Sequence, residues 1–162
     1  MRTSIVLAVA LTACSSGAKH DDAPATPVAP AAAAPKPANQ PKVSIDTPRG
    51  PVTVDVEIVS TPAKIEKGLM YRQYLAPDAG MLFLMGKEKA WTFWMHNTLI
   101  PLDMIFITKD MTVAGVVHDA EPKTDTLRQV ETPSLYVLEV NGGYTASHGV
   151  IDGAKVRFEN VQ

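Results

Sequence analysis

Cysteine is nearly absent from this chain: its 162 residues include one, Cys14. A single cysteine has no partner within the chain, so a disulfide framework is excluded and the domain must be held by its core. A membrane-spanning segment is missing at the start, where the apolar run Ile5–Leu11 falls far short of the roughly 20 residues that cross a bilayer. Basic residues are not in excess, because the net charge is −2. No nucleic-acid partner is therefore predicted.

Several catalytic signatures are missing as well. The chain has no Gly-x-Ser-x-Gly elbow and no glycine-rich phosphate loop, and Ser134 and Ser147 have no triad context. His96, His118 and His148 lack the short pair spacings of zinc sites. Neither a metal nor a cofactor is predicted, although a fold that gathered the three histidines would offer a metal site.

The first residues have the pattern of an export signal. Arg2 precedes the apolar run and small residues follow it, so residues 1–13 are predicted to be a signal peptide. The tetrapeptide that ends at Cys14, Leu-Thr-Ala-Cys, resembles the lipobox of bacterial lipoproteins. That resemblance implies lipidation of Cys14 and a membrane-anchored, extracytoplasmic protein, in the outer membrane or periplasm of a Gram-negative host. The alternative is a plain secreted protein with an incidental cysteine.

Residues 14–41 differ sharply in composition from the rest of the chain. Alanine and proline dominate, and no strand or helix period is present. Such a segment cannot bury enough apolar surface to offset its ordering entropy, so we expect a disordered tether. Proline-rich linkers extend by about 3.1 Å per residue, and a bare spacer is the favoured interpretation.

The remaining residues, 42–162, predict a single β-rich domain. Residues 52–59 alternate between apolar and polar with the period of a half-buried strand. Their apolar positions are expected to be buried and their polar positions exposed: Val52, Val54, Val56 and Ile58 against Thr53, Asp55 and Glu57. Other strands are predicted over 81–85, 91–95, 102–108, 112–118, 135–140 and 154–159. A short helix is predicted from Pro62 to about Tyr71, and a single helical turn near 145–148. Many short strands with little helix favour an antiparallel sandwich or barrel.

Four segments together resemble a known family. They are Gly68–Arg72, Gly80–Phe83, Phe93–Asp103 and Val137–Gly143, the last followed by Gly149–Gly153. In this order and spacing they are similar to the bacterial and archaeal family named domain of unknown function 192. The resemblance implies a compact, mainly β domain of the jelly-roll type, often exported, and it implies no activity.

Two positions depart from the family pattern. His96 stands where the family often has lysine, and Ala154 stands where aspartate often follows the last glycine. The second departure weakens any metal or acid role at that turn.

The candidate site follows from the aromatic segment around Trp94. Alternation along an extended chain puts Trp94 and His96 on one face, and Asn97 and Asp103 follow closely. Aromatic rings with a few polar groups are typical of a ligand cleft. The alternative is that Trp94 packs in a core and that Asn97 and Asp103 only cap turns.

Two further charged residues complete the candidate set. Arg72 is expected to pair with Asp103 or Glu139, or to receive an anionic ligand. Glu139 faces away from its strand neighbours Leu138 and Val140, which suggests a solvated position.

The leading functional interpretation is a lipid-anchored binding module for an unknown envelope ligand or protein. Its face would be formed by Arg72, Trp94, His96, Asn97, Asp103 and Glu139. The alternative is a hydrolase-like envelope enzyme that uses carboxylates, such as the pair Asp103 and Glu139, or a histidine in this region.

Overall fold

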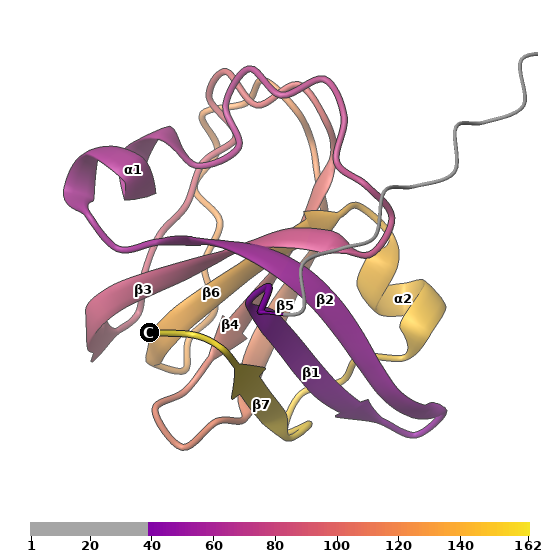
Figure 1. The fold of residues 1–162 in the computed structure, drawn as a ribbon. Helices are drawn as coiled ribbons and strands as arrows, with labels where there is room; N and C mark the ends of the chain where they lie inside the picture. Colours follow the sequence, from indigo (N-terminus) through magenta and orange to yellow (C-terminus); the bar gives the residue numbers. More distant parts are fainter. Residues whose placement is uncertain (1–38) are drawn as a thin grey trace, which may run out of the picture. The chain divides into compact units, whose positions relative to one another are not determined.

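The computed structural model describes residues 39–162. The predicted signal peptide, the Cys14 anchor and the linker up to residue 38 lie outside the described residues. The described part contains the strands β1 (Lys42–Thr47), β2 (Gly50–Val59), β3 (Ala79–Lys89), β4 (Leu102–Ile107), β5 (Val113–Ala120), β6 (Ser134–Asn141) and β7 (Val156–Glu159). Two short helices complete it, α1 (Pro62–Lys67) and α2 (Tyr144–His148). The fold is mainly β, as the sequence predicts (Figure 1).

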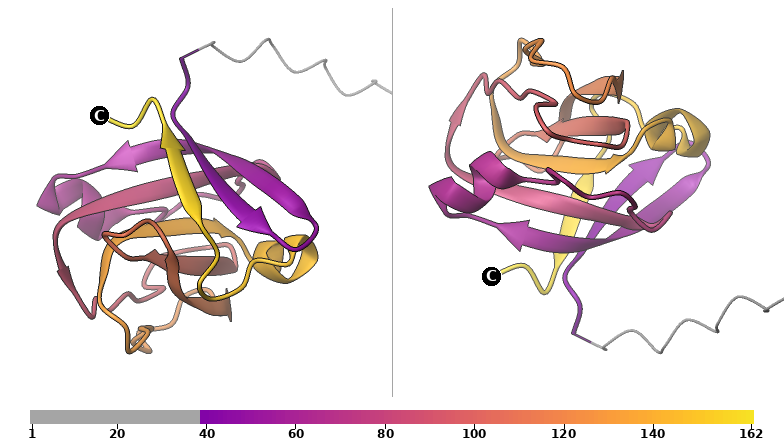
Figure 2. Two further views of the ribbon diagram at one scale, coloured as in Figure 1. Left: turned by 90° about the horizontal axis from the view of Figure 1, so that it is seen from below. Right: turned by 90° about the horizontal axis from the view of Figure 1, so that it is seen from above.

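The seven strands form one curled sheet in the order β5-β4-β6-β3-β2-β1-β7. Its two ends approach each other, because Thr112 before β5 forms an isolated bridge with Lys155 before β7. The Val113 amide also donates to the Ala154 carbonyl at 2.9 Å. The sheet is therefore a half-barrel whose curvature is visible from above and below (Figure 2).

One strand pair differs from the expected antiparallel arrangement. β2 and β3 run parallel, with Asp55 opposite Ala79 and Val59 opposite Phe83. Parallel neighbours need a crossover connection of a dozen or more residues. Residues 60–78, which include α1, supply that crossover.

The strand predictions need three corrections. β1 was not predicted, although its residues alternate and pair with both β2 and β7. Residues 91–95 do not form a strand, because Phe93 makes only an isolated bridge, with Arg128. Asp55 was expected to be exposed but is buried, since the crossover returns the chain there and the Asp55 amide donates to the Asp78 carbonyl at 2.9 Å.

The two faces of the sheet carry separate hydrophobic clusters. The first face includes Ile45, Val54, Leu138 and Val140, and α2 contributes Tyr144 to it. The second face buries Leu69, Met81, Phe83, Met95, Met104, Phe106 and Val137. The residues that follow α1 and the loop after β3 cover this face. Figure 1 shows α1 and α2 at opposite ends of the sheet.

Helix α1 has a clear start and end but no buried residue of its own. Pro62 is tolerated there because the amide groups of the first helical turn have no hydrogen-bond partner within the helix, so the amide proton that proline lacks is not needed. The helix ends at Lys67 and is capped by Gly68, short of the predicted end near Tyr71. Among residues 39–162 no helix has the length and hydropathy needed to cross a membrane.

Candidate functional site

A cavity of about 180 Å³ lies between α1, the second face of the sheet and the segment that follows β3. We call it the Glu139 cavity. Its lining consists of Ile65, Glu66, Lys67, Gly68, Leu69, Met70, Phe83, Met85, Trp91, Thr92, Phe93, Trp94, Thr98 and Glu139. The walls are thus mostly apolar and aromatic, with few polar groups, which is the usual composition of a small-ligand site.

Glu139 is the buried ionisable residue among those that line this cavity. Strand alternation directs Val137 and Glu139 toward the second face, where Glu139 lies opposite Met81 on β3 and Met104 on β4. Its residue is 5% exposed, and no hydrogen bond or ion pair reaches its carboxyl group from the described residues. Burial raises the pKa of Glu139 to about 8, so the carboxyl group is mostly protonated at neutral pH. The expectation of a solvated position for Glu139 is therefore wrong.

Aromatic rings line the same cavity as this carboxyl group. Phe93 packs edge-on against Phe83 with ring centroids 5.3 Å apart, and against Phe106 at 5.9 Å. Trp94 is 45% exposed at the edge of the cavity, so it is not a core residue. Trp91 and Trp94 are the only tryptophans in the chain, and both line the Glu139 cavity.

Gly68 lets the end of α1 approach the floor of the cavity closely. Its φ of 45° lies in the left-handed region that glycine adopts without strain. A Cβ atom at this position would lie 3.3 Å from Phe83 Cζ and 3.8 Å from Glu139 Oε2. A larger residue would fill space beside the carboxyl group.

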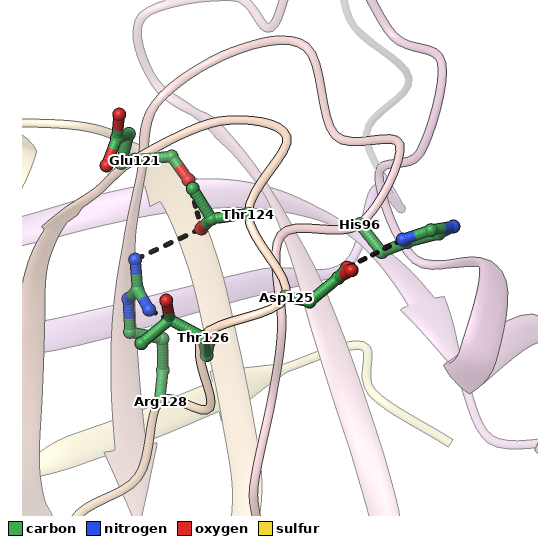
Figure 3. A network of polar contacts seen from close by, with 6 residues as sticks. All are labelled: His96, Glu121, Thr124, Asp125, Thr126 and Arg128. Atoms are coloured by element: carbon green, nitrogen blue, oxygen red, sulfur yellow. Dashed lines mark hydrogen bonds and ion pairs between the residues drawn. The ribbon is translucent and has the colours of Figure 1, made fainter.

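The wall formed by residues 91–98 is held by the loop that follows β5. Phe93 and Arg128 exchange backbone hydrogen bonds of 2.8 and 2.7 Å, and the Met95 amide donates to the Thr124 carbonyl at 2.9 Å. His96 Nδ1 lies 2.7 Å from Asp125 Oδ1 across the same contact (Figure 3). Arg128 ties the loop to itself through Thr124 and Thr126.

Trp94, His96 and Asn97 share a second, neighbouring hollow with α1. The rings of Trp94 and His96 have centroids 5.5 Å apart, so the expected common face of these two residues is present. Asn97 has a φ of 56°, a left-handed conformation that asparagine tolerates better than most residues. Its carbonyl accepts a 2.9 Å hydrogen bond from the Tyr71 amide.

Arg72 has a different partner from those expected. Its guanidinium group donates two hydrogen bonds of 2.5 Å to the carboxylate of Glu57 on β2. These hydrogen bonds hold the pKa of Glu57 below its usual range. The pairing with Asp103 or Glu139 is therefore wrong, and Arg72 lines a hollow on the other side of Gly68 and Met70.

Asp103 is fully buried on the first face of the sheet, where it organises a turn. Its carboxylate accepts hydrogen bonds from the amides of Asp119 at 2.7 Å and Gly143 at 3.0 Å. It also accepts from the Thr145 amide at 2.8 Å and the Thr145 hydroxyl at 2.5 Å. These bonds join β4, the end of β5 and the start of α2.

The six candidate residues are thus only partly gathered. Trp94 and Glu139 share the Glu139 cavity, and His96 and Asn97 lie in the hollow beside it. Asp103 lies opposite Val140 rather than Glu139, so the two carboxylates point to opposite faces of the sheet. Within residues 39–162 no three His, Cys, Asp or Glu side chains are grouped to hold a metal ion.

Sequence reasoning missed most of the cavity lining. Phe83 and Gly68 were seen only as parts of motifs, whereas Phe93 belonged to the aromatic segment of the candidate site. One signal was available, because each of the four segments that carry the family resemblance contributes to the lining, through Gly68, Phe83, Phe93 and Glu139 among others.

A comparison with curated proteins gives no match. A structure of a protein of unknown function from Novosphingobium aromaticivorans is 39% identical, with a TM-score of 0.70 over 72% of this chain and 83% of that chain. A proposed transcription regulator from Sinorhizobium meliloti is 36% identical, with a TM-score of 0.71 over 75% of this chain and 95% of that chain. The model of the uncharacterised family DUF192 matches residues 44–158, and this chain belongs to that family.

Proposed function

We propose that this chain is a binding protein, anchored to an extracytoplasmic membrane surface through lipidated Cys14, which takes up a small ligand in the Glu139 cavity. The observation that carries the proposal is a buried carboxyl group without a partner among the described residues, at the floor of an aromatic cavity. Removing a carboxyl group from bulk water without a protein partner costs free energy. Among the described residues only Ser134 Oγ is both fully enclosed and unpaired, so the Glu139 oxygens are not sealed off and can reach a ligand in the cavity. A ligand that supplies the missing partner would recover that cost.

The enzyme alternative has less support. Hydrolysis by paired carboxylates needs two carboxyl groups on either side of one bond. Asp103 faces away from Glu139, and its carboxylate is occupied by backbone and hydroxyl donors. A carboxyl group with a pKa near neutral suits a general acid, yet a second reacting group beside Glu139 is not evident among the described residues.

Transcription regulation, the activity named for the Sinorhizobium meliloti relative, also has less support here. DNA-binding surfaces depend on an excess of lysine and arginine that contacts phosphates. This chain has 15 basic and 17 acidic residues. An export signal would moreover take the domain away from DNA.

Tryptophan fluorescence tests the binding proposal directly, because both tryptophans lie at the cavity. Small neutral, anionic and cationic molecules are titrated into the purified full-length chain, and melting temperature is measured in parallel. The proposal expects at least one class to change the fluorescence with saturation and to raise the melting temperature. Trp94→Ala should weaken that binding.

Tyr74→Ala is the matched control, because Tyr74 is an exposed aromatic residue that does not line the Glu139 cavity. Binding that is lost equally in Trp94→Ala and Tyr74→Ala would place the ligand elsewhere. If no class of molecule binds, the proposal of a ligand cavity is wrong.

The anchor is tested separately by Cys14→Ser. Two or more acyl chains hold a protein stably in a bilayer, so the wild type should sediment with membranes and the variant should not. Equal membrane association of both forms would contradict the lipidation of Cys14.

A further inference from the structure

We infer that the ligand of the Glu139 cavity is a primary alkylammonium ion, whose charged head meets Glu139 and whose short apolar stem lies against the aromatic walls. This inference rests on the proposed binding function and adds the chemical class of the ligand. The same chemistry is presented by a free amine and by the side chain of a lysine in another protein.

The unpaired carboxyl group is the first reason. Both oxygens of Glu139 lack a hydrogen-bond partner among the described residues. A carboxylate accepts hydrogen bonds, and those from an ammonium group are about twice as strong as neutral ones. An ammonium head therefore supplies both the charge and the donors that this group lacks.

The walls are the second reason. Rings of Phe83, Phe93, Trp91 and Trp94 line the cavity, and Glu139 is the buried ionisable group among the described residues that line it. Aromatic faces attract cations, and the chain shows this itself, because Lys89 Nζ lies 3.9 Å from the centre of the Trp91 ring. Aliphatic carbons also pack well against such rings.

Size sets the length of the stem. An engineered protein cavity of about 150 Å³ holds a benzene molecule. The Glu139 cavity, at about 180 Å³, therefore has room for a four-carbon stem with an amine.

Charges at the rim do not oppose a cation. Two exposed residues of α1, Glu66 and Lys67, line the cavity and carry opposite charges. The residues that line it from β3 and from 91–98 are uncharged, and β4 places Met104 next to Glu139. Lys67 lines the cavity and Lys89 Nζ lies over the Trp91 ring, so among the described residues these two lysines are the internal competitors of a ligand.

Binding of an ammonium ion should be linked to proton release. At pH 7 the carboxyl group of Glu139 is mostly protonated, because its burial raises the pKa to about 8. An ammonium ion binds the ionised form, so the proton leaves Glu139 for the solvent as the ion pair forms. Affinity for an ammonium ion should therefore rise as the pH increases toward 8.

The test uses calorimetry and tryptophan fluorescence on the purified full-length chain with n-butylammonium, and with n-butanol as the uncharged analogue. Nα-acetyl-lysine amide presents the same head on a peptide-like body and separates a protein source from a free amine. The inference expects n-butylammonium to bind, with about one proton released per ligand at pH 7. Glu139→Gln should weaken that binding by about 30-fold or more.

Two results would overturn the inference. Equal binding of n-butanol and n-butylammonium, retained in Glu139→Gln, would mean that a neutral ligand occupies the cavity, and the binding function itself would stand. The pKa of Glu139 could also be found in its ordinary range in the wild type and raised in Lys67→Gln. That result would mean that Lys67 of the chain itself already pairs with the carboxylate. Binding by the lysine amide but not by n-butylammonium would assign the site to a protein partner.

Discussion

Asp103 on β4 and Glu139 on β6 are neighbouring buried carboxylic acids that the chain treats in opposite ways. Asp103 receives three backbone amides and one hydroxyl group. Glu139 receives no hydrogen bond from the described residues and lies among aromatic rings instead. They belong to the two faces of one curled sheet.

The contrast separates the residues that stabilise the fold from those available to a ligand. The donors around Asp103 are backbone groups that must be satisfied wherever they are buried, so Asp103 completes a turn. The burial of Glu139 is offset by nothing in the described residues, and it opens onto a cavity. The two family segments that carry these residues, Phe93–Asp103 and Val137–Gly143, therefore differ: Asp103 has a folding role and Glu139 has the proposed binding role.

Loss of Asp103 should have the largest effect on stability. Asp103→Ala leaves four donors without an acceptor, and we expect a loss of about 4 kcal/mol or more of unfolding free energy. Urea denaturation measures it, and a failure to fold would agree. Thr145→Val, which removes one of the four donors to Asp103 and also the hydroxyl partner of His118 Nδ1, should cost less, about 1 to 2 kcal/mol. A mild effect of Asp103→Ala would show that the turn does not depend on this carboxylate.

Glu139→Gln should instead stabilise the protein, and the gain should grow with pH. Because the folded pKa of about 8 is above the unfolded value of 4.5, the folded chain holds the Glu139 proton more tightly. Wild-type stability is unaffected by this group below pH 4.5 and falls as the pH rises toward 8.

The measurement is the unfolding free energy of both forms between pH 5 and pH 8. Their difference should change by roughly 3 kcal/mol in favour of the glutamine variant. A constant difference would mean that Glu139 ionises normally in the folded chain.

Substitutions of Asn97 should have a smaller effect on stability, and they show whether the residue is needed for its backbone conformation or for its side-chain amide. Asn97→Ala should cost about 1 kcal/mol, because alanine is strained at a φ of 56°. Asn97→Gly should restore most of that loss, since glycine adopts this conformation freely. Thermal unfolding of the two variants decides the matter. Equal losses would assign the effect to the side-chain amide.

The Arg72–Glu57 pair should contribute least. Both side chains are substantially exposed, and exposed ion pairs contribute less than about 1 kcal/mol. A double-mutant cycle of Arg72→Ala and Glu57→Ala should give a small coupling that decreases further in high salt. A coupling well above that value, insensitive to salt, would show that this pair is not a surface pair.

Local pattern predicted most of the sheet. The alternation along 52–59 correctly placed Val54 and Val56 in the core, and the alternation along β6 placed Glu139 opposite to Leu138 and Val140. β1 was missed although its own residues alternate, whereas the failure at residues 91–95 had a cause that was not local. Residues 91–95 alternate, but no strand pairs with them beyond the single bridge at Phe93.

The candidate site was less predictable than the fold. An aromatic segment drew attention to Trp94, yet the burial of Glu139 depends on α1 and residues 91–98 covering β6 from distant parts of the chain. The parallel β2–β3 pair that positions α1 was also missed. A short helix between two strands favours such a crossover and was the available signal.

The titration of the Glu139 carboxyl group by carbon-13 NMR tests the central claim most directly. Glu139→Gln identifies the resonance, because the assigned signal must be absent from that variant. A midpoint near pH 8 is predicted for a buried carboxyl group without a partner. A midpoint at or below the ordinary value of 4.5 would show that the group is solvated or already paired, and would contradict the proposed ligand site.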